Sequence, residues 1–447
     1  MHIVMFTNVY EPVIGGLQRS VATFAEDLRA AGHEVLIVTL AFSGARTSTE
    51  RIIRLPSIKG VAGTKFAAKL PVPAGLSERL DDFAPDIIHS HHPFMLGDTA
   101  LRVARKRRLP LIFTHHTLYE RYAYLFRSDS AWLERFAQEI ATEYANMCNL
   151  VIAPTPGIEQ LIRVRGVQAP IQIIPTGIDV DRFSRGRRKE FRETYGIPLD
   201  AFVLGYLGRV VQAKNMDFIT RATIPFLIAH PDAWFLLVGE GDAEEAVMQA
   251  FRDAGVAERV TSTGSLTGRS VADAYAAMDV FTFASKTETQ GIVLIECLCA
   301  GVPVVALDAR GTRDIVQHDR SGIILDGDAS PAAFAQVLGR LQKTPDEHKR
   351  LCQGARERAQ TFDRTHSLAR LLEAYAHVKQ MYPSQPTDED AWGRLQERFA
   401  AEWLLLKEKV SVLSLSMENG ESPRETNGAG QPQPSTSIGT GHLDAEL

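Results

Sequence analysis

Short apolar runs alternate with helical patterns along most of this chain, and they form two successive series. Apolar runs bounded by turn residues are typical of buried strands, and strands that alternate with helices form parallel sheets covered by helices. The first series predicts strands at residues 2–7, 34–40, 86–89, 110–115, 149–153 and 171–174. The second series predicts strands at residues 202–207, 233–238, 259–261, 279–284, 302–306 and 321–325. The sequence therefore predicts an α/β protein with two Rossmann-like, doubly wound domains.

The chain of 447 residues is too long for one ordinary core, which agrees with two domains plus additional segments. The expected division is an N-terminal domain at 1–178, a C-terminal domain at 179–362, helices at 363–416 and a tail at 417–447. The tail is rich in Gly, Pro, Ser and Thr, so we expect it to be disordered. Ligands of doubly wound sheets bind at the carboxyl ends of the strands, and two facing sheets predict a binding cleft between them.

Composition argues against several classes of protein. A net charge of −5 does not suggest nucleic-acid binding. The four cysteines have no metal-ligand spacing and suit a reducing cytosol. The sequence has no basic segment before an apolar core at its start, and no run of about 18 apolar residues. We therefore expect a cytoplasmic protein that binds no nucleic acid, and its oligomeric state stays open.

The most informative motif is SKTETQGIVLIECLCAGVPVVA at residues 285–306. Glu288 precedes an expected helix and Glu296 lies inside it, so the two carboxylates are at most about 12 Å apart along the helix. Between them, backbone N–H groups at the helix start lack intrahelical acceptors and favour an anion. These groups belong to Gln290, Gly291 and Ile292. Hydroxyls at both ends of a ligand with negative charge between them describe a nucleotide diphosphate-sugar.

Ordinary alternatives exist for both acids, since a Glu before a helix is a common cap and a Glu on an exposed face usually has no role. Glu296, however, lies in the apolar run IVLIECLCAG, where a buried acid is costly unless it is paired. Its position therefore favours a ligand role.

Two cations follow the expected strand at 202–207, in the sequence GRVVQAKN. Arg209 offers a bidentate fork and Lys214 a point charge, and both suit a diphosphate. The alternative is a pair of solvated surface charges. Because no DxD-type pair lies in a suitable place, we expect no metal ion and no other cofactor.

The Glu-x7-Glu spacing followed by AGVPVVA resembles retaining glycosyltransferase family 4, whose members have the GT-B fold. The motif TETQG resembles the corresponding sequence in the branch that glucosylates diacylglycerol and related lipids. The family resemblance covers roughly residues 1 to 380. It implies transfer of a hexose, with glucose favoured, from a nucleotide diphosphate-sugar such as UDP-glucose to a lipid hydroxyl. It also implies a late helix, at 363–381, that returns to pack on the N-terminal domain.

The resemblance assigns roles to particular residues. Glu288 would contact the sugar hydroxyls and Glu296 the ribose, while Arg209 and Lys214 would hold the diphosphate. His116, in FTHHTLYE, would lie beside the reacting sugar, because only one of His115 and His116 can face the ligand. The remaining expected donor contacts are Gly16 in the first loop, Gly239, Gly264 and Ser265. The expected acceptor contacts are His91, His92 and Gly97.

Two basic segments of the sequence can each be interpreted in two ways. The first contains Arg102, Arg105, Lys106, Arg107 and Arg108, and the second has six cations between residues 182 and 192. Such runs are most often solvated helix faces, but the stretch at Arg102–Arg108 also matches a surface that binds anionic lipid at the inner face of a membrane.

Several questions stay open in the sequence. A soluble acceptor, a nucleotide-sugar epimerase or hydrolase of the same fold, and a non-catalytic binding protein are the alternatives. UDP and GDP are not distinguished. Retention could proceed through a covalent enzyme intermediate or through a front-face mechanism, which the resemblance implies.

Overall fold

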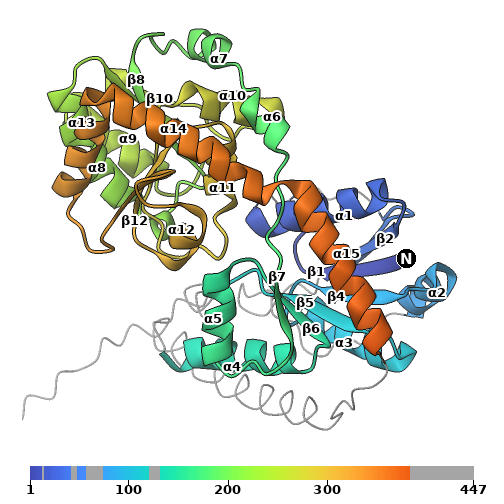
Figure 1. Cartoon of the computed structure of the whole chain (residues 1–447). Coiled ribbons are helices and arrows are strands. Elements are labelled where there is room, and N and C mark those ends of the chain that lie inside the picture. The colour runs from blue at the N-terminus through green and yellow to red at the C-terminus, as the bar shows by residue number, and fades with distance from the viewer. Residues whose placement is uncertain (13–14, 42–47, 57–73, 120–130, 383–447) are drawn as a thin grey trace, which may run out of the picture. The chain divides into compact units, whose positions relative to one another are not determined.

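The computed structural model describes residues 1–12, 15–41, 48–56, 74–119 and 131–382. These residues belong to one unit that spans 1–389 (Figure 1). The part of the predicted helices at 363–416 that follows residue 382, and the predicted disordered tail, lie outside the described residues. The domain boundaries proposed from the sequence stay predictions.

The first sheet has seven parallel strands in the order β3-β2-β1-β4-β5-β6-β7. The strands are β1 (His2–Thr7), β2 (Glu34–Leu40), β3 (Ile52–Leu55), β4 (Ile87–Ser90), β5 (Leu111–Thr114), β6 (Leu150–Ala153) and β7 (Ile171–Ile173). The sequence predicts six of them within one residue at each end. It misses β3, a four-residue strand whose side chains alternate between half-buried and buried, so that no continuous apolar run marks it.

Among the described residues, five α-helices connect the strands of this sheet. They are α1 (Gly16–Ala30), α2 (Ala74–Phe83), α3 (Leu96–Arg107), α4 (Ala131–Asn146) and α5 (Pro156–Val164). The apolar side of α1 faces the sheet, because Val21, Phe24 and Leu28 are buried against it. Gly32 follows the helix with φ = 83°, a left-handed conformation that only glycine adopts without strain.

The second sheet has six parallel strands in the order β10-β9-β8-β11-β12-β13. They are β8 (Phe202–Leu207), β9 (Ala233–Val238), β10 (Val260–Ser262), β11 (Val280–Phe283), β12 (Val304–Leu307) and β13 (Gly322–Leu325). Alternate residues of β8 enter different apolar clusters, with Val203 in one and Leu204 in the other. Both faces of the sheet are therefore buried, which confirms the doubly wound arrangement.

Nine helices accompany this sheet and bury its two faces. They are α6 (Val180–Ser184), α7 (Arg188–Thr194), α8 (Met216–Ala229), α9 (Glu244–Asp253), α10 (Arg269–Ala277), α11 (Ile292–Cys299), α12 (Arg310–Ile315), α13 (Pro331–Lys343) and α14 (Pro345–Ala359). In the described part of the chain, no helix is long and apolar enough to cross a membrane.

The last described helix, α15 (Arg364–Met381), packs on the first sheet beside α1 (Figure 1). Its buried residues Leu371, Tyr375 and Val378 share an apolar cluster with β1 and β2. The Tyr375 hydroxyl lies 2.7 Å from Nδ1 of His89 on β4. Arg364, at the start of α15, forms an ion pair with Asp27 of α1. The chain therefore returns to the first sheet after completing the second.

The basic stretch at 182–192 is largely paired within the protein. Arg187 binds Asp273, and both Arg188 and Arg192 bind Asp279. Arg192 has no exposed side-chain surface, and its guanidinium also donates to the carbonyl oxygens of Ala201 and Ala277 and of two further residues. It therefore ties α7 to the end of α10 and to the start of β8.

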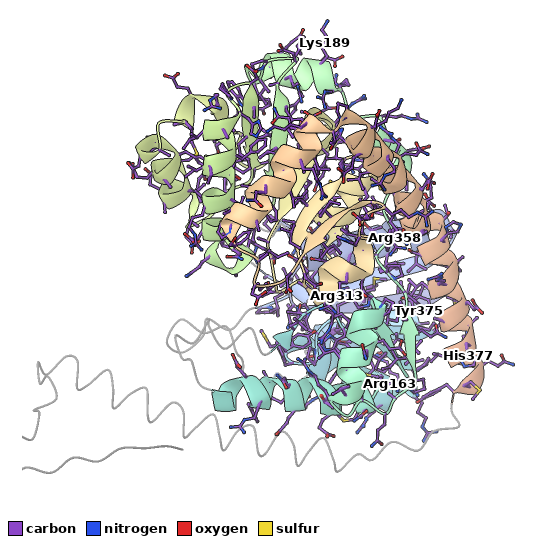
Figure 2. The ribbon with its side chains drawn as sticks, turned by 60° about the vertical axis from the view of Figure 1, so that its left-hand side comes forward. Arg163, Lys189, Arg313, Arg358, Tyr375 and His377 are labelled. Carbon is purple, nitrogen blue, oxygen red and sulfur yellow. The ribbon has the colours of Figure 1, made fainter. Side chains whose placement is uncertain are left out.

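We predict that Arg192→Met lowers the stability of the second sheet by about 3 to 5 kcal/mol, because it leaves a carboxylate and several carbonyl groups without their donor. The matched control is Lys189→Met on the same helix, whose side chain is 71% exposed and lies at the edge of the protein (Figure 2). This control should change stability by about 0.5 kcal/mol or less. Urea midpoints of the two variants test the prediction, and equal midpoints would contradict it.

Candidate donor site at the start of helix α11

The first turn of α11 presents backbone donors without acceptors. Gly291 caps the helix with φ = 68°, and a Cβ atom there would lie 3.0 Å from Cδ1 of Leu294. Within the residues described, the N–H groups of residues 290–293 donate to no backbone or side-chain acceptor. Unsatisfied donors and the positive end of the helix dipole together make this turn an anion-binding site.

Glu296 lies one turn into α11 and is 1% exposed. Its Oε1 forms an ion pair with Arg19 of α1, and the Tyr275 hydroxyl donates to its Oε2 at 3.0 Å. Burial raises the pKa of the Glu296 carboxyl, and the charge of Arg19 and the hydroxyl of Tyr275 oppose that rise. The sequence predicts that an acid here needs a partner, but it does not identify Arg19 or Tyr275.

Glu288 lies just before α11, and its carboxylate forms an ion pair with Lys214 at the end of the 3₁₀ turn Gln212–Lys214. Arg209 is exposed on the same loop, and no described carboxylate lies within ion-pair distance of it. Burial raises the pKa of Tyr206, the charge of Glu288 raises it further and the charge of Arg209 opposes this. The structure thus brings Glu288, Arg209 and Lys214 together around one loop.

The start of α1 adjoins the start of α11. A Cβ atom on Gly16 would lie 3.9 Å from Cδ1 of Ile292. The two helices therefore direct neighbouring N-terminal ends at the same region, and a Cβ atom at Gly16 would make only an ordinary van der Waals contact there.

Gly239, Gly264 and Ser265 lie on loops after β9 and β10 that are hydrogen-bonded to each other. The Gly239 N–H donates to the Gly264 carbonyl oxygen at 2.9 Å, and the Ser265 N–H donates to Oε1 of Glu240 at 3.0 Å. A Cβ atom on Gly239 would overlap the carbonyl oxygen of Gly208. Loop packing alone explains why residue 239 is a glycine. The contact of Gly239 with the donor substrate stays a prediction.

His115 and His116 point to different sides, as adjacent residues after a strand should. The ring of His116 stacks on His91, with 2.9 Å between Nε2 of His116 and Nδ1 of His91. The His116 carbonyl oxygen accepts a hydrogen bond of 2.7 Å from the Thr289 hydroxyl, which connects His116 to the loop of Glu288. Burial lowers the pKa of His116 and of His91, so both are neutral at pH 7.

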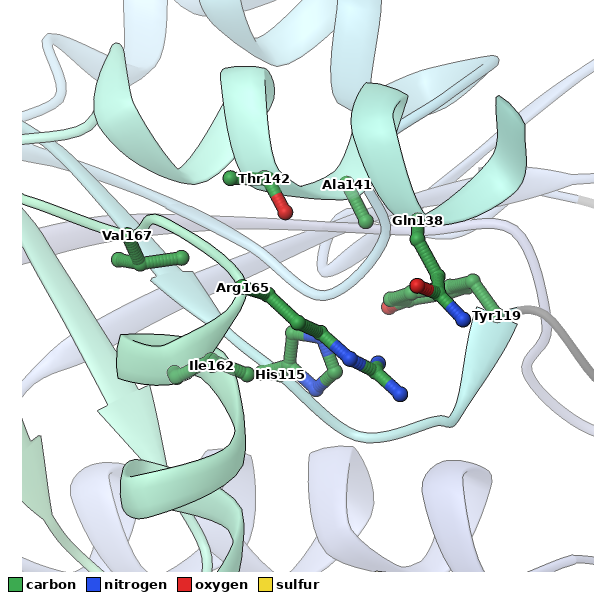
Figure 3. Close-up of a pocket in the computed structure, with 8 residues that line it drawn as sticks. All are labelled: His115, Tyr119, Gln138, Ala141, Thr142, Ile162, Arg165 and Val167. Atoms are coloured by element: carbon green, nitrogen blue, oxygen red, sulfur yellow. The ribbon is translucent and has the colours of Figure 1, made fainter. Parts of the chain in front are cut away.

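The side chain of His115 lines a separate small pocket between α4 and α5, together with Tyr119, Gln138 and Arg165 (Figure 3). The residues that line this pocket do not include Glu288 or Glu296, so we assign it no part in the donor site.

The expected acceptor residues are enclosed. His91 and His92 are both buried, and Nδ1 of His92 accepts the N–H of Asn8 at 3.1 Å. Gly97 lies at the start of α3, and a Cβ atom there would overlap the carbonyl oxygen of His92. Close packing therefore explains this glycine, and the acceptor roles of the three residues stay predictions.

The loop before α11 is fixed by contacts with distant parts of the chain. The Gln290 side chain pairs with the backbone of Thr176, accepting at 3.0 Å and donating at 2.9 Å. Its amide is therefore engaged, which leaves its backbone N–H as the donor available to a ligand. Asp314 of α12 accepts a 3.0 Å hydrogen bond from the Gly157 N–H at the start of α5.

Comparisons with known proteins agree with this geometry. The profile "Glycosyltransferase Family 4" matches residues 14–182, and "Glycosyl transferases group 1" matches residues 201–344. The D-inositol 3-phosphate glycosyltransferase 1 of Catenulispora acidiphila is 32% identical over 315 residues, which cover 68% of this chain and 74% of that protein. The chain belongs to glycosyltransferase family 4. It is a glycosyltransferase.

Two further similarities bear on acceptor and fold. The alpha-monoglucosyldiacylglycerol synthase of Acholeplasma laidlawii is 28% identical over 345 residues, covering 73% of this chain and 85% of that protein. The structure of Anabaena HepE in complex with UDP superposes with a TM-score of 0.69 at 19% identity, covering 84% of this chain and 100% of that chain. The two Rossmann-like sheets and this likeness confirm the GT-B fold of the family 4 enzyme.

We predict that Gly311→Ala lowers the transfer rate of this family 4 enzyme without unfolding it. A Cβ atom at Gly311 of α12 would lie 2.6 Å from the carbonyl oxygen and 2.7 Å from Cβ of Glu288, so the Glu288 loop must shift. A displacement of about 1 Å at a reacting group costs on the order of 100-fold in rate.

Gly75→Ala on α2 is the control, since no atom lies within 4 Å of a Cβ added there. Steady-state rates of both variants at saturating donor test the prediction, and an unchanged rate for Gly311→Ala would contradict it.

Proposed function

We propose that this glycosyltransferase moves a hexose, with glucose first among candidates, from a nucleotide diphosphate-sugar to a hydroxyl of a lipid such as diacylglycerol. The proposed donor is a UDP-sugar, and the proposed reaction retains the anomeric configuration and uses no metal ion. The observation that carries the proposal is the unsatisfied first turn of α11, with an acid on each side of it and two cations beside it.

The proposed donor pose follows from the charges. The diphosphate would lie on the N–H groups of residues 290–293, where Arg209 and Lys214 can reach it. Glu288 would then accept hydrogen bonds from hydroxyls of the hexose, and Glu296 would accept hydrogen bonds from hydroxyls of the ribose. Gly16, at the start of α1 beside Ile292, would lie next to the diphosphate.

The proposed catalytic effect depends on where negative charge develops as the donor bond breaks. When the bond from the anomeric carbon to the diphosphate oxygen breaks, negative charge builds on the leaving phosphate, and preorganised cations and N–H donors stabilise it. Arg209, Lys214 and the α11 turn supply the positive charge that a metal ion supplies in other enzymes. His116 is neutral, so it can hydrogen-bond to the sugar without adding charge beside the reacting carbon.

In the proposed pose both carboxylates accept hydrogen bonds from hydroxyls of the donor, which disfavours a covalent enzyme intermediate. Glu296 is held by Arg19 and Tyr275, and Glu288 by Lys214. We therefore propose a front-face reaction, in which an oxygen of the leaving phosphate accepts the proton of the acceptor hydroxyl.

The lipid acceptor rests on the TETQG wording and on the name of the Acholeplasma relative, a diacylglycerol glycoside synthase. We also propose peripheral binding to an anionic membrane at its cytoplasmic face. Of the basic stretch on α3, Arg102 pairs with Asp98 and Arg107 with Asp81, whereas Lys106 and Arg108 are exposed. Each exposed cation adds roughly 1 kcal/mol near such a surface.

A radiolabelled transfer assay tests the substrate assignment. With UDP-glucose and diacylglycerol vesicles, label should enter the organic phase with the α configuration of the donor. Excess EDTA should leave the rate unchanged, because the cations that stabilise the leaving group are side chains. Label that stays in water as a new glycoside would refute the lipid acceptor, and free sugar formed without any acceptor would indicate a hydrolase. GDP-mannose serves as the competing donor.

We predict that Lys214→Ala lowers turnover by about 100- to 1,000-fold, as expected when one group that stabilises transition-state charge is lost. The fold should survive, because Lys214 is on a surface loop and contacts only Glu288 among described acids. Lys349→Ala, an exposed cation on α14, is the control with the same change of charge. Wild-type turnover in Lys214→Ala would refute the role assigned to it.

A further inference from the structure

Arg19 has no role in the function described so far, yet it makes the closest contact to the buried acid of the donor site. It lies in the first turn of α1, three residues after Gly16. Its guanidinium pairs with Oε1 of Glu296 although its own side chain is 38% exposed. One arginine from the first sheet's helices therefore completes a site built mainly on the second sheet.

Glu296 depends on this partner for its charge. The groups that act on it are Arg19 from α1, Tyr275 from α10 and, at longer range, Arg182 from α6. Burial favours the neutral acid, and the charge of Arg19 is the largest opposing effect. A hydroxyl such as that of Tyr275 cannot replace a full positive charge, so loss of Arg19 would leave the carboxyl protonated over a wider pH range.

The ionised form matters because of its hydrogen-bonding capacity. A carboxylate has about four lone-pair sites, whereas a protonated carboxyl is in part a donor. Arg19 occupies one site on Oε1 and Tyr275 one on Oε2, so each oxygen keeps one site for a further donor. Two remaining acceptor sites on one carboxylate match the two adjacent hydroxyls of a ribose.

We propose that Arg19 is a positioning residue of the donor site, which holds Glu296 charged and oriented so that it accepts both ribose hydroxyls of the nucleotide. This inference rests on the proposed function, because it presumes that the nucleotide of a sugar donor binds at α11. It adds a residue that acts through Glu296 and need not touch the substrate.

Titration of UDP into the purified full-length chain by calorimetry tests the inference, with GDP titrated in parallel and the tighter ligand used for the variants. Measurements run from pH 7.0 to pH 9.0, above the second pKa of about 6 of a phosphate group. Arg19→Gln should bind about tenfold more weakly than wild type at pH 7.0, because without the charge of Arg19 burial keeps most of the Glu296 carboxyl protonated. Its affinity should recover as the pH rises and the carboxyl ionises, since a buried Glu can titrate near 8 to 9.

Four variants separate this role from simple packing. Arg19→Lys keeps the charge, so its affinity should not vary over this pH range. Glu296→Gln should bind more weakly at every pH without recovery, and Arg19→Gln in that background should add no further loss. Arg221→Gln removes an exposed arginine that pairs with Asp217 on α8, and it should bind as wild type does.

Two results would overturn the inference while leaving the proposed function intact: wild-type affinity in Arg19→Gln, or a loss that is equal at all pH values and adds to that of Glu296→Gln. A wild-type protein that binds neither UDP nor GDP would instead refute the proposed function, and this inference with it. Thermal melting of each variant shows whether a loss of binding reflects unfolding.

Discussion

A carboxylate buried in an apolar helix is the constraint on which the site depends. Every neighbour of Glu296 within α11 is apolar, and the acid itself is almost without exposure to solvent. A charge in such a place persists only when it is paired, and the partner must come from outside the helix. That partner, Arg19, belongs to the helix that begins at Gly16. The same ion pair thus satisfies a buried acid and brings the starts of α1 and α11 together.

The elements that the sequence predicts well are those with a local signal. Parallel strands buried on both faces have apolar sequences, so the twelve described strands other than β3 were predicted from their own residues. The prediction missed β3 because Arg54 interrupts its short apolar run. Glu288, Glu296, Arg209 and Lys214 were also predicted from local signals, namely spacing within one segment and position after a strand, and their roles stay predictions. The structure brings these four residues to one region.

The contacts that the sequence does not predict join residues far apart in the chain. Nothing local to Arg19 indicates that it meets Glu296, 277 residues later. The basic stretch at 182–192 suggested a solvated or lipid-facing surface, because the acids that pair with it, Asp273 and Asp279, lie on other elements. The sequence also does not predict close glycine contacts such as that of Gly311 with Glu288, since only the folded chain brings the two backbones together.

The charges of the site are matched to its proposed ligand. Without a ligand, Lys214 pairs with Glu288 and Arg19 pairs with Glu296. Arg209 has no ion-pair partner among the described carboxylates. The formal charges of these five side chains sum to about +1. The N-terminal ends of α1 and α11 each add roughly half a positive charge. A diphosphate carrying about two negative charges therefore brings the region close to neutrality. Binding can then proceed by exchange of partners, in which Lys214 turns to the phosphates and Glu288 is released to accept sugar hydroxyls, while Glu296 keeps its arginine throughout.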